Sequence, residues 1–326
     1  MKRKITYGLL IALLILGSEL KSQQLPIFSQ YVFNAFILNP AMAGYDGYTS
    51  INTTARQQWL GIRKAPQTVS ASFQTRILQR SYKIVNSPIR NENVLRPSTE
   101  GRVGLGGYII NDSNGDVART GMQFAYAYHI QLGNHQLSFG LAAKLFQFRI
   151  DEQNLTFGRD VDPLANNFAN VGYTPDLDFG MLWTNQVYFI GVSVSNLFES
   201  VVSIGSRSFD YRIDRHYWVM GSYRFDITRE FFIEPTVLMK TTERWIPQAD
   251  LGAKFYYTNN YWGGLAFRTD GSLIFSAGMQ WRSLYIGYAF DYSFSRLQRF
   301  NLGTHEISIS YKFGDNAKRY RWLRRY

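Results

Sequence analysis

Alternation of large apolar residues with small or polar ones along many short segments is the feature that most constrains the fold of this chain. Between Met122 and Leu132, for example, every second residue is large and apolar, and those in between are alanine, glutamine or histidine. A period of two is typical of β-strands whose two faces meet different surroundings. The sequence therefore predicts an all-β, antiparallel fold. About fourteen such segments lie near 49–58, 67–77, 101–110, 119–132, 135–149, 174–184, 186–196, 214–226, 229–240, 247–257, 260–269, 271–281, 282–294 and 303–313.

Two architectures are built from strands with one apolar and one polar face, a soluble sandwich and a transmembrane barrel. Most segments have about ten residues, the length that a tilted strand needs to cross an apolar layer. The even number of segments, the 16% aromatic content and the final aromatic residue Phe313 favour the barrel. We interpret 49–313 as an up-and-down β-barrel of about fourteen strands, with the sandwich as the alternative. Short turns are predicted at one end of the barrel and long loops at the other, near 78–100, 150–173, 197–213 and 294–302.

The N-terminus predicts export. Basic residues at 2–4 precede an apolar run from Ile5 to Gly17, which is 13 residues long. That run is too short to span a bilayer comfortably and is typical of a signal peptide. We predict a signal peptide over 1–22 that is cleaved near Ser22, with an N-terminal membrane anchor as the alternative. The predicted location of the mature protein is the outer membrane.

The net charge of +11 comes mostly from the two ends of the chain. Three positive charges lie in the leader and five in the tail 314–326, which leaves about +3 for the body. This distribution does not favour nucleic acid as a partner. A solvated end is the simple interpretation of the tail, and a periplasmic contact with an acidic partner or lipid phosphate is the functional hypothesis. The tail residues in that hypothesis are Lys318, Arg319, Arg321, Arg324 and Arg325.

The sequence predicts no enzyme, cofactor or metal site. The absence of cysteine excludes disulfides and thiolate ligands. The stretch from Asp112 to Asp116 resembles a calcium loop, but Val117 and Gln123 occupy the positions where such a loop needs glycine and glutamate. A hairpin turn is the better interpretation. The four histidines are scattered, and no serine stands in a recognisable nucleophile motif.

Residues 23–48 form a separate segment that is aromatic and apolar but has neither helical nor strand periodicity. Exposed in water, such a run would promote aggregation, so it has to pack against something. We predict that it enters the barrel from the periplasmic end and fills it, with Asn39 and Pro40 forming a turn. The candidate plug or partner-binding residues are Tyr31, Phe33, Asn34, Phe36, Leu38, Asn39, Pro40 and, further on, Trp59.

Charged residues on the less apolar faces of the strands predict a polar lumen. Mutually paired charges are the structural interpretation, and a selective channel is the functional one. An outer-membrane porin is therefore the alternative function. The residues concerned are Lys144, Asp176, Asp178, Arg224, Glu234, Lys240, Asp250, Lys254, Arg268 and Asp291.

Four motifs in close succession resemble the signature of the PorP/SprF family of type IX secretion and gliding proteins in Bacteroidetes, in particular its SprF-like members. One departure is Arg63, where a glycine is expected. Further similarity continues through 106–115, 126–128, 234–238 and 261–264, so that it covers most of the mature chain. The four motifs are FSQYVFN at 28–34, LNPAMAG at 38–44, RQQWLGI at 56–62 and APQT at 65–68.

The resemblance implies an outer-membrane β-barrel that serves the type IX system. It implies a role in export or surface anchoring of a large adhesin with a type-B C-terminal sorting domain. It also implies three kinds of contact: outer-membrane lipids, the secreted adhesin, and periplasmic secretion or motor proteins attached to peptidoglycan.

Overall fold

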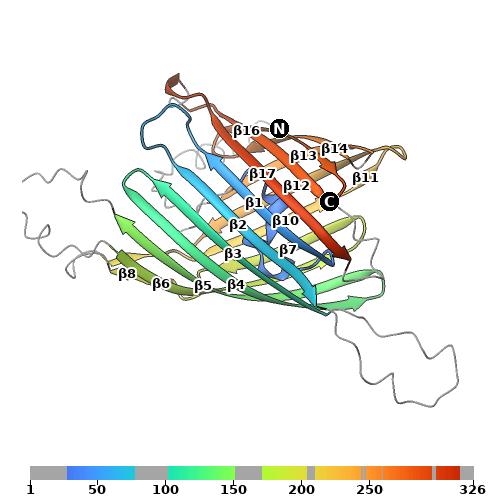
Figure 1. Ribbon diagram of the computed structural model, residues 1–326, viewed down its shortest axis with the longest axis horizontal. Helices are drawn as coiled ribbons and strands as arrows, with labels where there is room; N and C mark the ends of the chain where they lie inside the picture. Colours follow the sequence, from blue (N-terminus) through green and yellow to red (C-terminus); the bar gives the residue numbers. More distant parts are fainter. Residues whose placement is uncertain are drawn as a thin grey trace, which may run out of the picture.

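The alternating segments form one antiparallel sheet that closes into a barrel (Figure 1). The computed structural model describes residues 28–77, 102–150, 171–203, 210–243, 245, 247–258, 260–295 and 299–315. β1 pairs with β17, and β10 pairs with both β7 and β12, so the sheet closes on itself. The predicted fourteen-strand barrel is thereby confirmed, with β10 and β11 sharing one position, and the sandwich alternative is wrong. The strands of the barrel are β1 (Tyr48–Gln57), β2 (Gln67–Ile77), β3 (Val103–Asn114), β4 (Val117–Leu132), β5 (His135–Ile150), β6 (Val171–Thr184), β7 (Tyr188–Ser195), β10 (His216–Tyr223), β11 (Phe225–Asp226), β12 (Phe231–Thr242), β13 (Gln248–Tyr257), β14 (Tyr261–Arg268), β15 (Ser272–Trp281), β16 (Leu284–Ser293) and β17 (Thr304–Asp315).

Two local features were not predicted from the alternation. A short hairpin, β8 (Val201–Ser203) and β9 (Asp210–Arg212), lies within the connection from β7 to β10. The break between β10 and β11 lies opposite Pro235 of β12. Proline has no N–H to donate to the ladder, which explains why the pairing is interrupted there.

The two ends of the barrel are named here after β1: the Tyr48 end, where β1 begins and β17 ends, and the Gln57 end, where β1 ends. The connections from β5 to β6, β7 to β10 and β16 to β17 all lie at the Gln57 end. By contrast, β2 ends and β3 begins at the Tyr48 end, so the predicted long loop 78–100 is not at the same end as the other three. The expectation that all long connections share one end was therefore wrong. Most of 78–100 and 150–173 lies outside the described residues.

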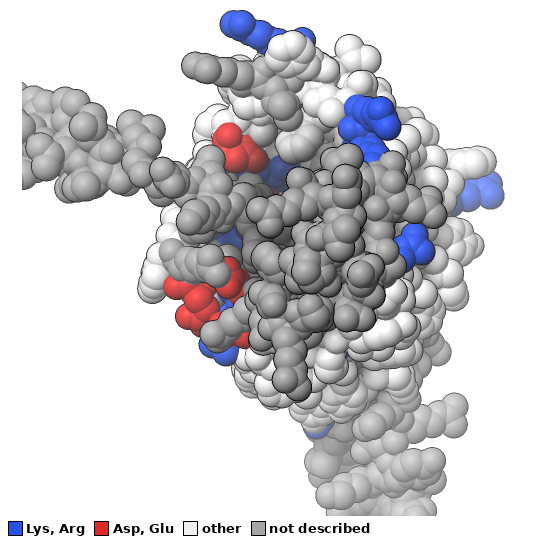
Figure 2. Space-filling model, turned by 90° about the vertical axis from the view of Figure 1, so that its left-hand side faces the viewer, with Lys and Arg blue, Asp and Glu red and all other residues white. Residues whose placement is uncertain are grey.

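The barrel is apolar on its outer face and polar inside. On β4, Phe124 points outward and is 74% exposed, whereas its neighbour Gln123 points into the lumen and is 1% exposed. In the face that Figure 2 shows, the visible Lys, Arg, Asp and Glu side chains form small separate groups, while much of the described surface around them is uncharged. This is the reverse of a soluble protein and matches a barrel whose outer wall faces lipid.

Two short helices lie inside the barrel. They are the 3-10 helices η1 (Tyr31–Ile37) and η2 (Pro40–Met42). Asn39 caps η2, because its side-chain oxygen accepts a hydrogen bond from the Ala41 N–H, and Pro40 stands in the first helical position, where no N–H is needed. Neither helix within the described ranges has the length and apolar character that crossing a membrane would require.

Candidate functional site: the filled lumen

Residues 28–47, called the plug from here on, run through the lumen from one end toward the other. Ser29 lies beside Arg56 and Glu306, which are close to the Gln57 end. Gly44 donates its N–H to Gln74, which lies toward the Tyr48 end of β2. The plug thus crosses the lumen before the chain enters β1, and with the wall around it forms the largest buried apolar cluster of the described residues.

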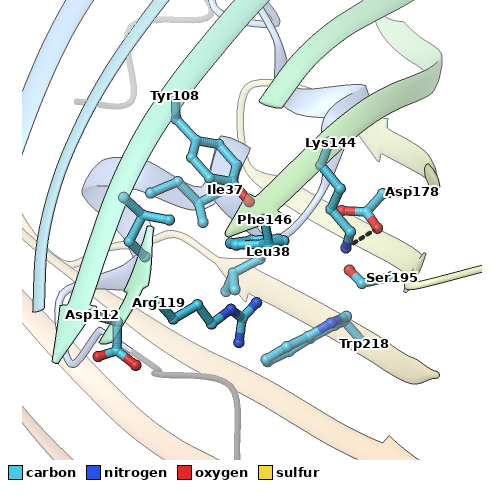
Figure 3. A pocket seen from close by; sticks show the side chains of 11 residues that line it. Ile37, Leu38, Tyr108, Asp112, Arg119, Lys144, Phe146, Asp178, Ser195 and Trp218 are labelled. Carbon is cyan, nitrogen blue, oxygen red and sulfur yellow. Dashed lines mark hydrogen bonds and ion pairs between the residues drawn. The ribbon is translucent and has the colours of Figure 1, made fainter. Parts of the chain in front are cut away.

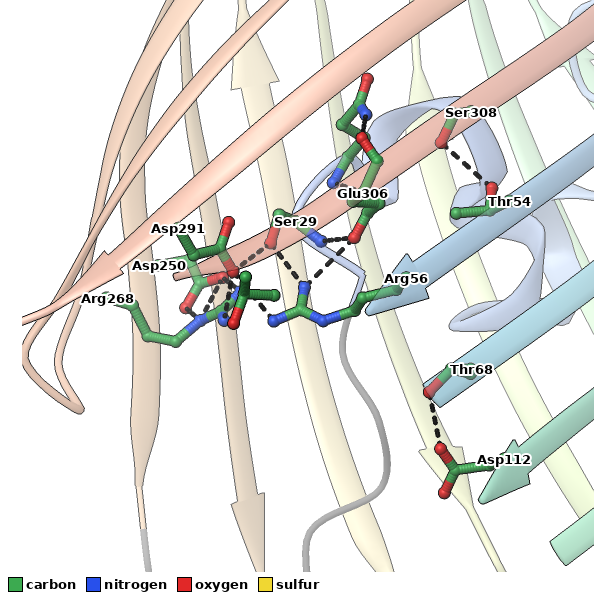
Figure 4. Close-up of polar contacts among 12 residues, drawn as sticks. Ser29, Thr54, Arg56, Thr68, Asp112, Asp250, Arg268, Asp291, Glu306 and Ser308 are labelled. Atoms are coloured by element: carbon green, nitrogen blue, oxygen red, sulfur yellow. Dashed lines mark hydrogen bonds and ion pairs between the residues drawn. The ribbon is translucent and has the colours of Figure 1, made fainter. Parts of the chain in front are cut away.

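A buried network of charges holds the start of the plug (Figure 4). The backbone N–H groups of Ser29 and Gln30 donate to the two carboxylate oxygens of Glu306, at 2.7 and 2.8 Å. Arg56 bridges Glu306 and Asp291 at 3.1 and 2.8 Å, and the Ser29 hydroxyl donates to Asp291 at 2.6 Å. Buried charges stabilise a fold only when they are paired with good geometry.

The same network continues along the wall. Arg268 contacts Asp250 at 2.7 Å and Asp291 at 3.6 Å. Arg56, Asp291, Glu306, Arg268 and Asp250 are together called the clamp. All five side chains are at most 5% exposed. The charges at these wall positions are therefore paired with one another.

Farther along the plug, polar side chains bind the wall. Asn39 donates from its amide nitrogen to the carbonyl oxygens of Met181 and Val192, at 3.1 and 3.2 Å. The Ser193 hydroxyl donates to the Leu38 carbonyl at 2.6 Å. One asparagine therefore caps η2 and joins β6 to β7 at the same time.

Glycines in the wall let the plug approach its backbone closely. A Cβ atom on Gly140 would lie 2.2 Å from the Ala41 nitrogen, and one on Gly180 would lie 2.0 Å from the Asn39 side-chain oxygen. On Gly104, a Cβ would lie 1.9 Å from the Ala43 oxygen. These distances are too short for any side chain, so the wall is shaped to fit this plug.

Aromatic side chains of the plug fill the remaining space. Phe33 packs on Trp262 with ring centroids 5.2 Å apart, and Phe36 meets Tyr108 edge-on. The structure places seven of the candidate residues in the lumen, namely Tyr31, Phe33, Asn34, Phe36, Leu38, Asn39 and Pro40.

The other candidate residues are not part of the plug. Trp59 lies half-buried in the β1–β2 connection at the Gln57 end, where its backbone N–H donates to the Thr304 hydroxyl at 3.4 Å. The basic tail residues Lys318, Arg319, Arg321, Arg324 and Arg325 lie outside the described residues.

A cavity remains beside the plug on one side of the lumen, toward the Gln57 end (Figure 3). Its volume is about 40 Å³. Lys144 and Asp178 pair at 2.5 Å on its wall, and the Arg119 guanidinium lies 3.9 Å from the centre of the Phe146 ring. Its lining residues are Ile37, Leu38, Tyr108, Ile110, Asp112, Arg119, Lys144, Phe146, Asp178, Ser195 and Trp218.

Sequence reasoning identified the lining charges Lys144 and Asp178 but missed Trp218, Tyr108 and Phe146. Each of these aromatics lies on the polar face of its strand, and that exception to the alternation is the signal that could have found them. Within the described ranges, no group of three or more histidine and carboxylate side chains is placed to hold a metal ion.

The closed sheet, the apolar outer wall and the filled polar lumen define a β-barrel membrane protein. The profile of one family, described as "Type IX secretion system membrane protein PorP/SprF", matches residues 20–311. The chain belongs to this family and is thus a component of the type IX secretion system. Among curated proteins, none matches the chain.

Three solved structures with a similar arrangement are remote in sequence. A deletion mutant of TodX, a monoaromatic hydrocarbon channel, has 9% identity and a TM-score of 0.47, covering 85% of this chain and 93% of that one. The outer membrane protein Omp33 of Acinetobacter baumannii has 7% identity and a TM-score of 0.41, and the match covers 82% of this chain and 99% of that one. The KdgM porin has 9% identity and a TM-score of 0.34, and the match covers 81% of this chain and 99% of that one.

Proposed function

We propose that this protein is an SprF-like component of the outer membrane that anchors, or assists the export of, a large cell-surface adhesin with a type-B C-terminal sorting domain. Membership of the family supports the link to type IX secretion. One observation favours anchoring over conduction: the lumen is occupied by the protein's own plug, whose first residues are bound by the clamp. A lumen filled in this way offers no free path to a polypeptide.

Deletion of the gene tests the proposal. Cells without the gene are expected to lose the adhesin from their surface, measured with an antibody on intact cells, and the gene supplied in trans is expected to restore it. Total adhesin in lysed cells and culture medium is the control, because it separates failed display from failed synthesis. Normal surface display in the deletion strain would contradict the proposal.

A general or solute-specific porin is the alternative function. The charged lumen motivates it, since a polar interior is typical of porins. The plug argues against it. Single-channel recording of the purified barrel in a planar bilayer decides between the two, and we expect no steady conductance from the intact chain. Stable open channels would favour the porin.

Two further contacts belong to the proposal. Residues 1–22 direct export and are removed, so the mature chain fractionates with outer membranes, where its outer wall contacts lipid. The basic tail contacts periplasmic secretion or motor proteins attached to peptidoglycan. Removal of 317–326 is expected to reduce recovery of those proteins with the tagged barrel, and unchanged recovery would refute the tail's part in it.

A further inference from the structure

Three polar atoms without a hydrogen-bond partner among the described residues lie on β10 and β12, where Trp218 lines the cavity and His216 and Lys240 stand next to it. Within the described residues, the indole nitrogen of Trp218, the ammonium group of Lys240 and Nε2 of His216 have no such partner. Trp218 and Lys240 stand directly opposite each other on β10 and β12, and are 2% and 5% exposed. Buried polar groups are nearly always hydrogen-bonded, so a group of unpartnered ones on neighbouring strands needs an explanation.

The spare hydrogen-bonding capacity of this group is mainly that of donors. An indole nitrogen and an ammonium group can only donate. The Lys240 ammonium lies 5.7 Å from the centre of the Trp218 ring, so the two donors are close together. Nδ1 of His216 lies 2.9 Å from the Asp214 carbonyl oxygen, which puts its hydrogen on Nδ1 and leaves Nε2 of the neutral ring as an acceptor.

The carboxylates of the cavity are already occupied. Asp178 accepts from the Lys144 ammonium and from the backbone N–H of Asn196. Asp112 accepts from the Thr68 hydroxyl at 2.6 Å. An incoming cation would therefore compete with the existing contacts of these carboxylates. An incoming anion would instead meet donors that have no hydrogen-bond partner within the described residues.

The rest of the lining is suited to an apolar group. Tyr108, Phe146 and the plug residues Ile37 and Leu38 all border the cavity. In Figure 3 the Arg119 guanidinium points into the space between the Phe146 and Trp218 side chains, which adds a cation without removing the apolar surface.

We propose that this cavity is a binding site for a carboxylate attached to an apolar group. Trp218 donates to the carboxylate, with the ammonium of Lys240 and the guanidinium of Arg119 as nearby cations, and the apolar group packs on Tyr108 and Phe146. Two kinds of molecule have this chemistry, a free organic acid and the C-terminal residue of a polypeptide. The proposal stands independently of adhesin anchoring.

Calorimetric titration of the purified full chain in detergent tests the site. The probes are 3-phenylpropionate, its amide, and an acetylated tetrapeptide ending in phenylalanine with either a free or an amidated C-terminus. We expect at least one free acid to bind, and its amide to bind about tenfold more weakly or not at all, because the amide lacks the charge that the donors recognise. Binding of the small acid alone assigns the site to organic acids, and preference for the peptide assigns it to polypeptide ends. Equal binding of acid and amide, or binding of neither acid, overturns the proposal.

Variants locate the binding within the lumen. Trp218→Phe keeps a ring but removes the N–H, and Lys240→Met removes the ammonium. Each is expected to weaken binding of the acid about tenfold, as loss of a charge-assisted or buried hydrogen bond does.

Lys254→Met is the matched control. Lys254 is also a buried lysine with no hydrogen-bond partner among the described residues, but it lies over Phe33 and Trp262, away from the cavity. We expect the Lys254→Met variant to bind the acid with the same affinity as the wild type. If Lys240→Met does not fold, the conservative Trp218→Phe variant decides. Equal affinity of Trp218→Phe and wild type, or equal losses in the two lysine variants, would place the acid elsewhere.

Discussion

The two sides of the lumen use the same kinds of residue in opposite ways. On the clamp side, the carboxylates of Asp291 and Glu306 accept from Arg56, the Ser29 hydroxyl and backbone N–H groups of the plug at 2.6–3.1 Å. On the cavity side, Trp218 and Lys240 are equally buried but have no hydrogen-bond partner within the described residues. Pairing on one side retains a segment of the chain itself, and spare donors on the other side are suited to receive a molecule from outside.

Breaking the clamp should have the largest effect on stability. Arg56→Met leaves the buried Glu306 carboxylate without its cation and leaves Asp291 with Arg268 at 3.6 Å, and loss of one partner of a buried ion pair costs about 3–5 kcal/mol. We expect that decrease in the free energy of unfolding of the barrel in detergent, measured by denaturant titration. The matched control is Lys64→Met, which breaks a half-exposed pair with Asp116 and should cost less than about 1 kcal/mol. Equal losses would show that the clamp stabilises the barrel no more than a surface pair does.

Filling the close contact between wall and plug should have the next largest effect. Gly140→Ala puts a Cβ 2.2 Å from the Ala41 nitrogen, so the plug has to shift, at a cost of about 1–3 kcal/mol. The control is Gly263→Ala on β14, where the nearest atom would be 3.9 Å away and a change within about 0.5 kcal/mol is expected. The unfolding free energy of both variants checks this. A stable Gly140→Ala protein would mean that the plug is held loosely.

Asn39→Ala should have a somewhat smaller effect. It removes the cap of η2 and the two hydrogen bonds to β6 and β7, for an expected loss of about 1–2 kcal/mol. Hydrogen exchange of the plug amides locates the loss, since exchange at 39–44 should accelerate more than exchange in β14. Unchanged protection of the plug would show that other contacts hold this part of it.

On the cavity side, Trp218→Phe should have the smallest effect on stability. The indole N–H has no partner to lose within the described residues, so the unfolding free energy should fall by only about 1 kcal/mol, the cost of the space that the smaller ring leaves in the buried site. A loss well above about 2 kcal/mol would indicate that this nitrogen is hydrogen-bonded after all, and the contrast between the two sides would then fail.

The strands could be predicted from the sequence because alternation is local. Each residue from Met122 to Leu132 indicates its own face without knowledge of its neighbours in space. The presence of the plug was also predictable, since an aperiodic aromatic segment has to be buried. Its direction was not, because it depends on contacts such as that of Ser29 with Glu306, which are 277 residues apart in the chain.

The cavity could not be predicted for a related reason. Lys240 was recognised as a lumen residue, but whether a lumen charge is paired depends on the three-dimensional arrangement of several strands. Lys144 pairs with Asp178 on the neighbouring strand, whereas Lys240 has no hydrogen-bond partner within the described residues and lies 5.7 Å from the centre of the Trp218 ring. In the sequence, these two lysines look alike.

The contact between Ser29 and Glu306 also links the closure of the ring to the plug. Glu306 lies on β17, the last described strand, and it binds residues near the first described residue of the chain. β17 is also the strand that joins β1 to close the ring. One strand therefore has two partners that lie at the other end of the sequence, a wall strand on its edge and the plug on its inner face. A barrel without β17 would have neither a closed wall nor the carboxylate that binds Ser29 and Gln30.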